Sequence, residues 1–266
     1  MTKIALTIAG SDSCGGAGIQ ADLKTFSSLR VHGLNAVTSV VSESPHSVDS
    51  IFIIPAEEVA KQIHSLVPHY PFTAIKTGLL CNAEIVEAVA KALSKPELAH
   101  IPLIIDPVIT ASTGDSLTAH SITEGYKKHL FSRAHLITPN LIEAQIILGE
   151  ELDTVSKMQA GAQKIAELYN TSCLIKGGHA SFTDQSVDLL YTNGKLISFA
   201  LPWIDIPSAH GSGCTLSAAI TANVAKGQLL PTAVGNAKSW LHKAITNSLI
   251  WSQNQSTTYC INQAGI

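Results

Sequence analysis

Residues 3–42 read KIALTIAGSDSCGGAGIQADLKTFSSLRVHGLNAVTSVVS, and this stretch decides the fold. Its two apolar, β-branched runs, at 3–9 and 34–42, are typical of buried strands. The segment between them, 19–32, carries apolar residues at helical spacing. The stretch therefore predicts a strand, a glycine-rich turn, a helix and a second strand.

The same alternation of strands and helices continues along the chain. We expect helices at 55–69, 83–93 and 154–169, a short helix after Asn140, and strands at 72–78, 102–108, 134–140 and 172–178. Continuous apolar strands separated by helices indicate a parallel sheet covered on both faces. Residues 187–200 form a hairpin pattern around Asn193-Gly194, which predicts an antiparallel edge, and helices at 214–227 and 232–251 end the fold.

The composition indicates a compact protein with a large core and small-molecule ligands. Hydrophobic residues make up 45% of the 266 residues and charged residues only 14%, whereas an average globular chain is about 25% charged. The formal net charge is -3, and no basic cluster is longer than Lys127-Lys128. This removes the main electrostatic reason to expect nucleic acid or an anionic membrane as a partner.

The cysteines and the apolar runs favour a cytoplasmic protein. The five cysteines are scattered and include no C-x-x-C pair, so we expect neither disulfides nor structural zinc. No stretch approaches the ~20 apolar residues of a membrane span, and the first apolar run is shorter than the ~7–15 residues of a signal peptide. Because no linker or internal repeat interrupts the chain, we expect one domain over residues 1–266.

Polar residues gather directly after the expected strands, where open parallel sheets bind their ligands. These segments are GSDSCGGAG (10–18), SESPHS (42–47), KTGLLCN (76–82), DPVITASTGD (106–115), TPNLIEA (138–144), KGGHAS (176–181) and HGSGC (210–214). In the last of them, Gly211 and Gly213 let backbone N–H groups approach an anion, and the helix expected from about Thr215 adds its dipole. The same glycines would also serve a plain turn into a core helix.

Two acids stand at strand ends of this sheet edge. Asp106 precedes a proline and could serve turn chemistry alone, and Asn140 with Glu143 has the spacing of a capping box. Together with Lys176 and the glycine turn, they supply the parts of Mg²⁺-assisted phosphoryl transfer. The P-loop, the complete G-x-G-x-x-G fingerprint and the protein-kinase HRD and DFG motifs are absent from the sequence, which argues against those enzyme classes.

In these segments the chain resembles the bacterial hydroxymethylpyrimidine and phosphomethylpyrimidine kinases of thiamine biosynthesis, within the ribokinase-like superfamily. The matching segments run in the family's order from residue 5 to about 241: ALTIAGSDSCGGAGIQADLKTFSSLRVHG, KTGLL, DPV, STGDSL, LITPNLIEA, LIKGGH, HGSGCTLSAAI and AKSWL. The combination of GSDSCGGAGIQAD with HGSGCTLSAA is specific for this branch and its pyridoxal-kinase-like relatives.

The resemblance implies a ribokinase-like three-layer α/β/α sandwich with a mostly parallel central sheet and an antiparallel edge. It further implies ATP and Mg²⁺ as cofactors, and commonly a homodimer. The implied reaction is phosphorylation of 4-amino-5-hydroxymethyl-2-methylpyrimidine and then of its monophosphate, which gives the diphosphate.

The resemblance also implies which residues form the site. The substrate-binding residues would be Gly10, Ala17, Asp22, Glu43, Leu79 and Val108. The ATP-binding residues would be Asn140, Lys176, Thr215 and Lys238. Asp106 and Glu143 would organise the magnesium, and the catalytic anion hole would comprise Gly211, Ser212, Gly213 and Cys214.

Cys214 stands where most ribokinase-like sugar kinases carry an aspartate base. A thiolate at a helix N-terminus has a lowered pKa, so Cys214 could act as a base near neutrality. Alternatively it leaves space, because a neutral thiol repels the phosphate of a second, already phosphorylated substrate less than an aspartate would. Both roles agree with the sequence.

Glu43 is the main departure from the family, which usually carries Ala-Gln-Asn-Thr at the end of this strand; Glu43 replaces the glutamine and Pro45 the threonine. A glutamine amide offers a donor and an acceptor, whereas an ionised glutamate only accepts. The aminopyrimidine could bind protonated, Glu43 could be protonated by burial, or the acceptor could be another ring such as a pyridoxine-type alcohol. We favour the first two, and Leu79, where methionine is common, should still pack against the ring.

Three functions remain in view from the sequence. The first is the pyrimidine kinase, and the second is a pyridoxine or pyridoxal kinase, which the Cys214 branch and Glu43 keep open. The third is a non-catalytic ligand-binding regulator on the same fold, which the intact set of Asp106, Glu143 and Lys176 weighs against.

Overall fold

A nine-stranded sheet forms the centre of the protein. The computed structural model describes residues 2–44, 47–109, 122–178, 184–206, 210–253 and 256–265. The strands of the sheet are β1 (Ile4–Asp12), β2 (His32–Glu43), β3 (Val48–Ile53), β4 (Ala74–Thr77), β5 (Leu103–Ile105), β6 (Leu136–Ile137), β7 (Cys173–Gly177), β8 (Gln185–Thr192) and β9 (Lys195–Pro202). They lie in the order β3-β2-β1-β4-β5-β6-β7-β8-β9. The six inner strands are parallel, whereas β3, β8 and β9 pair antiparallel with their neighbours.

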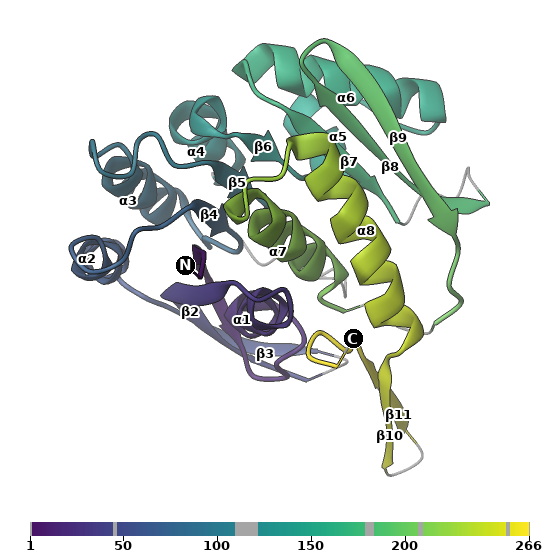
Figure 1. Cartoon of the computed structure of the whole chain (residues 1–266), viewed down its shortest axis with the longest axis horizontal. Coiled ribbons are helices and arrows are strands. Elements are labelled where there is room, and N and C mark those ends of the chain that lie inside the picture. The colour runs from purple at the N-terminus through teal and green to yellow at the C-terminus, as the bar shows by residue number, and fades with distance from the viewer. Residues whose placement is uncertain are drawn as a thin grey trace.

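Helices cover both faces of the sheet and complete three layers (Figure 1). They are α1 (Gly18–Ser28), α2 (Ala56–Leu66), α3 (Ala83–Leu93), α4 (Ile122–His129), α5 (Leu141–Leu148), α6 (Val155–Tyr169), α7 (Ser212–Ala225) and α8 (Leu230–Thr246). The first core joins the sheet to α2 through α6, and the second joins it to α1, α7 and α8. This arrangement confirms the expected α/β/α sandwich.

Alternate residues of the inner strands feed the two cores. In β1, Leu6 and Ile8 are fully buried in the first core, while Ala5 is fully buried in the second. In β5, Ile104 faces the second core, and its neighbours Leu103 and Ile105 face the first. A strand that buries both of its faces needs a continuous apolar run, which is why residues 3–9 and 102–108 read as they do.

The pairing of β1 with β2 shifts register near the carboxyl end of β1. Ala9 pairs with Val37, but Ser11 pairs with Val40, so one extra residue of β2 lies opposite Gly10. A Cβ on Gly10 would lie 2.6 Å from the Ser39 hydroxyl oxygen, which only glycine avoids. The shift brings the carboxyl ends of β1 and β2 together.

One sequence prediction about elements needs correction, and two elements, α4 and β3, were not predicted. The last helix ends at Thr246 rather than 251, and residues 249–251 instead begin a two-stranded ribbon of β10 (Leu249–Gln253) and β11 (Ser256–Cys260), which projects beyond α8 (Figure 1). The antiparallel edge at β8 and β9 is confirmed, whereas the second antiparallel strand, β3, was not expected because it lacks clean alternation of buried and exposed residues. None of the helices in the described part of the chain is both long and apolar enough to span a membrane.

Candidate active site

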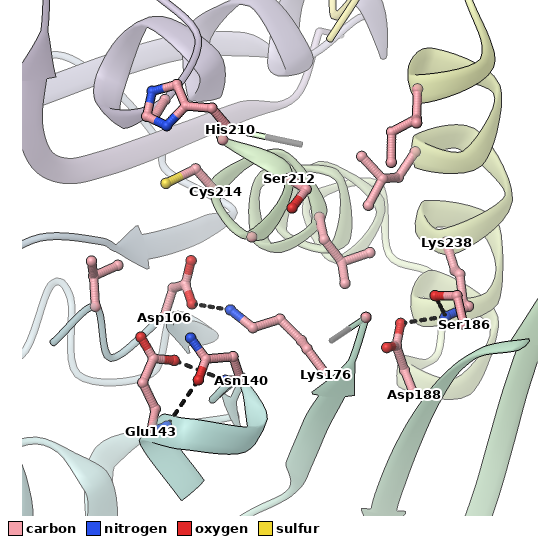
Figure 2. Close-up of a pocket in the computed structure, with 18 of the residues that line it drawn as sticks. Asp106, Asn140, Glu143, Lys176, Ser186, Asp188, His210, Ser212, Cys214 and Lys238 are labelled. Atoms are coloured by element: carbon pink, nitrogen blue, oxygen red, sulfur yellow. Dashed lines mark hydrogen bonds and ion pairs between the residues drawn. The ribbon is translucent and has the colours of Figure 1, made fainter. Parts of the chain in front are cut away.

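One large cavity opens at the carboxyl ends of the parallel strands. Its volume is about 720 Å³, within the usual range of ligand pockets. Its walls come from the ends of β1, β2, β5 and β7, from the starts of α5 and α7, and from α8. Most of the residues predicted for the site line it: Gly10, Ala17, Glu43, Leu79, Asp106, Val108, Asn140, Glu143, Lys176, Gly211, Ser212, Gly213, Cys214 and Lys238 (Figure 2).

The glycine turn forms the start of α7 at the middle of the cavity. Gly211 caps the helix with φ of 80°, a left-handed conformation that favours glycine. The first intrahelical bond at this end runs from the Thr215 N–H to the Gly211 carbonyl, at 2.9 Å. The N–H groups of residues 212–214 therefore precede the helical ladder and are available to an anion.

The Cys214 thiol lies at this turn and is neutral at physiological pH. Burial raises its pKa to about 11, and the Lys76 charge and a hydrogen bond from the Gly18 N–H only partly oppose that effect. The nearby Asp106 carboxylate adds to the rise. The raised pKa favours the second of the two roles considered for Cys214, in which a neutral thiol leaves space beside the turn.

A short ion pair lies beneath the glycine turn. The Lys176 ammonium, at the end of β7, lies 2.6 Å from one oxygen of Asp106 (Figure 2). The Ser217 hydroxyl donates to the other Asp106 oxygen at 3.0 Å. Burial disfavours the Asp106 charge, but Lys176 and Lys76 outweigh it and hold the pKa below its usual range. A Cβ on Gly213 would lie 3.1 Å from the Lys176 nitrogen, so the lysine nearly touches the turn.

Glu143 combines a structural role with a place in the cavity wall. Its carboxylate accepts the Asn140 N–H at 2.8 Å, and the Asn140 side chain accepts the Glu143 N–H at 2.8 Å, which completes a capping box. Burial raises its pKa to about 7; Lys176 opposes the rise, and the Asp106 charge adds to it. From the sequence, Glu143 could have been a capping residue alone. The structure shows that it forms the capping box and also lines the ligand cavity.

The far end of the cavity is mostly apolar and contains one buried ion pair. Lys238 of α8 lies 2.8 Å from the Asp188 carboxylate and 3.3 Å from the Ser186 hydroxyl oxygen. The apolar residues of this end are Leu201, Pro202, Trp203, Ile204, Ile206, Leu216, Leu241 and Ile245. The sequence analysis missed Asp188 and Ser186 because the hairpin pattern assigned them only a strand role.

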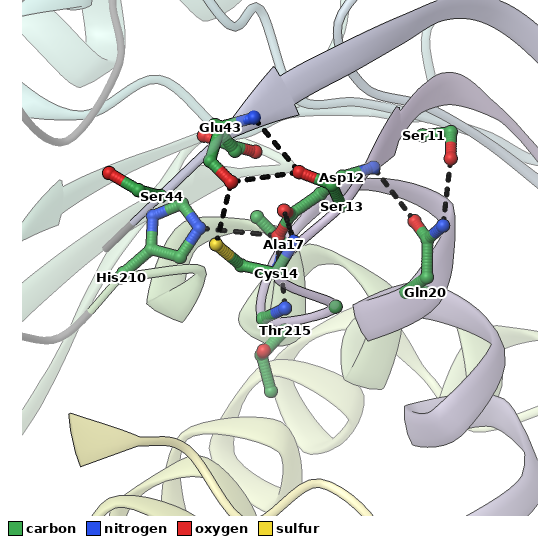
Figure 3. A network of polar contacts seen from close by, with 12 residues as sticks. Ser11, Asp12, Ser13, Cys14, Ala17, Gln20, Glu43, Ser44, His210 and Thr215 are labelled. Carbon is green, nitrogen blue, oxygen red and sulfur yellow. Dashed lines mark hydrogen bonds and ion pairs between the residues drawn. The ribbon is translucent and has the colours of Figure 1, made fainter. Parts of the chain in front are cut away.

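A polar network lies at the opposite end, around Asp12 (Figure 3). The Asp12 carboxylate accepts the N–H groups of Cys14, Gly16 and Ala17 at 2.6–2.9 Å, and His210 lies 3.3 Å away. These contacts outweigh burial and hold the Asp12 pKa below its usual range, while the hydrogen bond to Asp12 raises the His210 pKa. Neither Asp12 nor His210 was predicted, although both belong to motif segments quoted from the sequence.

Glu43 is half-buried in the same network. Burial raises its pKa to about 7, and the hydrogen bond to Asp12 and the Asp12 charge add to the rise. Ligand atoms of Asp12, Glu43 and His210 lie within 4.8 Å of one another, a spacing that can suit a metal ion. Because Asp12 already accepts three backbone N–H groups, we interpret the cluster as one in which the two carboxyl groups share a proton.

Two predicted site residues lie outside the cavity wall formed by the described residues. Asp22 is fully buried on α1, where it accepts the Thr7 hydroxyl at 2.5 Å and pairs with the buried Lys76 ammonium at 2.9 Å. Thr215 is also fully buried, beneath the turn. Lys76 belongs to the KTGLL segment, but no pattern in the sequence indicates that this lysine is fully buried under the site.

Some expectations fall outside the part of the chain that the structure describes. These are Pro45, the STGDSL segment at 112–117 and residues 179–181 of the KGGHAS segment.

Comparisons with known proteins agree on one family. A sequence model described as phosphomethylpyrimidine kinase matches residues 12–258. The hydroxymethylpyrimidine/phosphomethylpyrimidine kinase of Staphylococcus aureus strain MSSA476 is 41% identical over 248 residues, which cover 91% of this chain and 88% of that protein.

Solved structures of kinases superpose on nearly the whole chain. The pyridoxal kinase of Staphylococcus aureus, in complex with AMP-PCP and pyridoxal, has a TM-score of 0.88 and 31% identity, covering 99% of this chain and 94% of that one. A phosphomethylpyrimidine kinase from Clostridium difficile has a TM-score of 0.81 and 33% identity, covering 92% and 100%.

Proposed function

The chain belongs to the phosphomethylpyrimidine kinase family, and from this premise we propose its substrates and the role of each site residue. It is a phosphotransferase of the ribokinase-like fold that serves thiamine biosynthesis. The proposed reaction transfers the γ-phosphoryl group of ATP to 4-amino-5-hydroxymethyl-2-methylpyrimidine and then to the monophosphate. Both steps use the same cavity.

One observation carries this proposal. A single cavity of about 720 Å³ joins a polar recess around Glu43 to an apolar end around Trp203, with the glycine turn, Lys176 and Asp106 between them. A phosphoryl group that passes from one ligand to the other must cross the middle of such a cavity. This is where the positive charge and the free backbone N–H groups gather, and preorganised donors of this kind stabilise transferring phosphoryl groups.

The hydrogen-bonding groups of Glu43 favour an aminopyrimidine as the ligand of the polar recess. An aminopyrimidine edge presents an amino donor beside a ring-nitrogen acceptor, and a protonated carboxyl group presents the matching acceptor and donor. The raised pKa of Glu43, to about 7, makes that proton available. If the proton moves to the ring, the same two hydrogen bonds persist and become charge-assisted. Glu43 thus replaces the family glutamine without loss of a donor.

The acceptor hydroxyl would be activated mainly by position. With its pKa raised to about 11, the Cys214 thiol keeps its proton near neutrality, so little thiolate is present to act as a base. A loose phosphoryl-transfer transition state needs little help from a base. The neutral thiol leaves space without negative charge beside the turn, which suits an acceptor that already carries a phosphate.

ATP would bind with its base at the apolar end and its phosphates over the turn. Lys176 would hold the phosphates from below, Asn140 would contact them from the start of α5, and Lys238 would keep a positive charge beside the nucleotide. The backbone N–H groups of 212–214 would receive the transferred group. Each of these residues lines the cavity.

Asp106 and Glu143 are suited to Mg²⁺ by their chemistry. Carboxylate oxygens are its preferred protein ligands. Burial raises the pKa of Glu143 to about 7, and the nearby Asp106 charge adds to the rise. Asp106 and Glu143 would hold the cation, which when bound would supply positive charge to the transferring phosphoryl group. Lys176 keeps Asp106 ionised for this role.

A pyridoxal-type kinase is the second candidate, because the Staphylococcus aureus pyridoxal kinase matches 99% of this chain at a TM-score of 0.88. Its ring lacks the aminopyrimidine edge, so a protonated Glu43 would meet it with one hydrogen bond fewer. The family resemblance further supports a cytoplasmic, single-domain kinase that forms a homodimer, which size-exclusion chromatography would test.

Initial rates of ADP release with three alcohols in parallel test the proposed function. With ATP and Mg²⁺, we expect turnover with the hydroxymethylpyrimidine and with its monophosphate, and a lower kcat/KM with pyridoxine. Turnover with pyridoxine alone would replace the proposed substrate by the second candidate.

A further inference from the structure

The C-terminal segment is folded against the back of the site. Ile261 and Gln263 are 4% and 2% exposed, and the Asn262 N–H donates to the Ala244 carbonyl at the end of α8, at 3.2 Å. Figure 1 shows the C-terminus beside α1, on the side where the ribbon of β10 and β11 leaves α8. This segment lies beyond residue 258, where the match to the family ends.

Gln263 donates two hydrogen bonds from one amide nitrogen. Its Nε2 atom lies 2.8 Å from the Gly16 carbonyl oxygen and 3.0 Å from the Thr215 hydroxyl oxygen. The first acceptor belongs to the loop between β1 and α1, and the second belongs to the first turn of α7. One buried amide group therefore joins two segments that lie about 200 residues apart in the chain.

Both segments carry groups of the proposed active site. The Gly16 N–H donates to Asp12, which anchors the network around Glu43. On the other side, Gly211 packs so closely on the Gly16 carbonyl that a Cβ on it would lie 1.9 Å from that oxygen. The Gly16 carbonyl is thus the point where the substrate-side loop and the anion turn meet, and Gln263 holds it.

We infer that Gln263 is a positioning residue, which fixes the anion turn at the start of α7 relative to the loop that holds the substrate end of the cavity. Gln263 does not belong to the cavity wall formed by the described residues, so it acts through Gly16 and Thr215 rather than on a ligand. The inference rests on the proposed function only in taking the turn as the place of phosphoryl transfer.

The contacts predict a defect in turnover rather than in binding. Loss of the two hydrogen bonds would leave the Gly16 carbonyl and the Thr215 hydroxyl without this donor and would let the turn shift. A displacement of about 1 Å can reduce catalysis by about 100-fold. The loop that anchors the Glu43 network keeps its own hydrogen bonds, from the Gly16 and Ala17 N–H groups to Asp12, so the KM for the pyrimidine should change little.

The test replaces Gln263 by methionine, which keeps the side-chain length but cannot donate a hydrogen bond. We expect kcat with the hydroxymethylpyrimidine to fall by about 10- to 100-fold, with KM within about threefold of the wild-type value. Gln253→Met, an exposed residue of the neighbouring β10, is the matched control and should leave kcat unchanged. Thermal unfolding of each variant measures the folded fraction at the assay temperature.

A double-mutant cycle with Thr215→Val makes the outcome decisive. Thr215→Val removes one acceptor at nearly constant volume, and its loss of kcat should not add fully to that of Gln263→Met if the two residues act as a unit. A folded Gln263→Met enzyme with wild-type kcat would overturn the inference, as would fully additive losses. If Gln263→Met is unfolded, Thr215→Val alone must lower kcat with little change in KM; unaltered kcat would refute the role. Wild-type inactivity toward every alcohol would instead count against the proposed function.

Discussion

Glu43 shows how one substitution changes the protonation of a binding site. A glutamine at this position would be neutral at all pH values, whereas the Glu43 carboxyl loses its proton as the pH rises through about 7. The titratable groups that face it are Asp12 on β1, His210 before α7, and the Cys14 thiol, which keeps its proton because its pKa is raised to about 11. The Glu43 carboxyl therefore changes its protonation near neutrality, beside His210, whose pKa is raised by its hydrogen bond to Asp12.

The pH profile expected for Glu43→Gln follows from the titration of Glu43 near neutrality. In the wild type, kcat/KM for the neutral pyrimidine should decline above a pH of about 7, by up to about tenfold per pH unit, because the donor is lost. Glu43→Gln should remain active and lack this decline. Glu143, whose pKa is also raised to about 7, titrates in both enzymes. The difference between the two profiles therefore reports on Glu43 together with His210, whose pKa the Glu43 charge helps to raise.

Steady-state kinetics between pH 5.5 and about 9 would measure both profiles. Superimposable curves would eliminate the proton as a determinant of substrate binding. The wild-type decline would then need a group common to both enzymes.

Cys214 provides a second test at the level of one residue. If it leaves space and avoids charge, Cys214→Ser should retain both phosphorylation steps within about tenfold. Cys214→Asp should support the first step but slow the second by about tenfold or more, since the added carboxylate repels the substrate phosphate. Equal failure of both variants at both steps, measured with each pyrimidine separately, would contradict the space-and-charge account.

The start of α7 is the element on which the site depends. Gly211 is left-handed and also touches the Gly16 carbonyl, so alanine there meets both backbone strain and a direct overlap. We expect Gly211→Ala to lower kcat by about 100-fold, because the turn must move. Gly227, at the other end of α7, has φ of 84° and open space around its missing Cβ.

Gly227→Ala is therefore the matched control for strain alone. It should cost roughly 1–2 kcal/mol of unfolding free energy and leave kcat unchanged. Urea unfolding and ADP release on both variants separate the two effects. Equal kcat values for Gly211→Ala and the wild type would show that the contact with Gly16 does not shape the site.

At the scale of elements, the sequence was informative where patterns were strong. Apolar runs such as 3–9 correctly predicted strands that are buried on both faces. Asn193-Gly194 correctly predicted the hairpin, and both residues have positive φ there. The predicted continuation of the last helix through 249–251 was wrong. These apolar residues fit the helical pattern, but they belong to the exposed ribbon of β10 and β11. No pattern in the sequence indicated β3, whose half-exposed residues do not alternate.

Across the whole molecule, the cavity wall was largely predictable and its supports were not. Residues that line the cavity stand at strand ends in recognisable segments, as Asp106 and Lys176 do. The residues beneath the wall, such as Lys76, Asp22 and Gln263, act through contacts between segments far apart in sequence. Such contacts become visible only when the sheet order and the packing of α1 and α7 are known.

The central claim is that one cavity phosphorylates a hydroxymethylpyrimidine twice. The most direct measurement carries the parallel assay to completion with the pyrimidine alcohol, excess ATP and Mg²⁺, and separates the pyrimidine products by ion-exchange chromatography as ADP accumulates. The account predicts a monophosphate that rises and then falls as the diphosphate forms, with two ADP molecules released for each pyrimidine consumed. ATP consumption that leaves the pyrimidine unphosphorylated would contradict it.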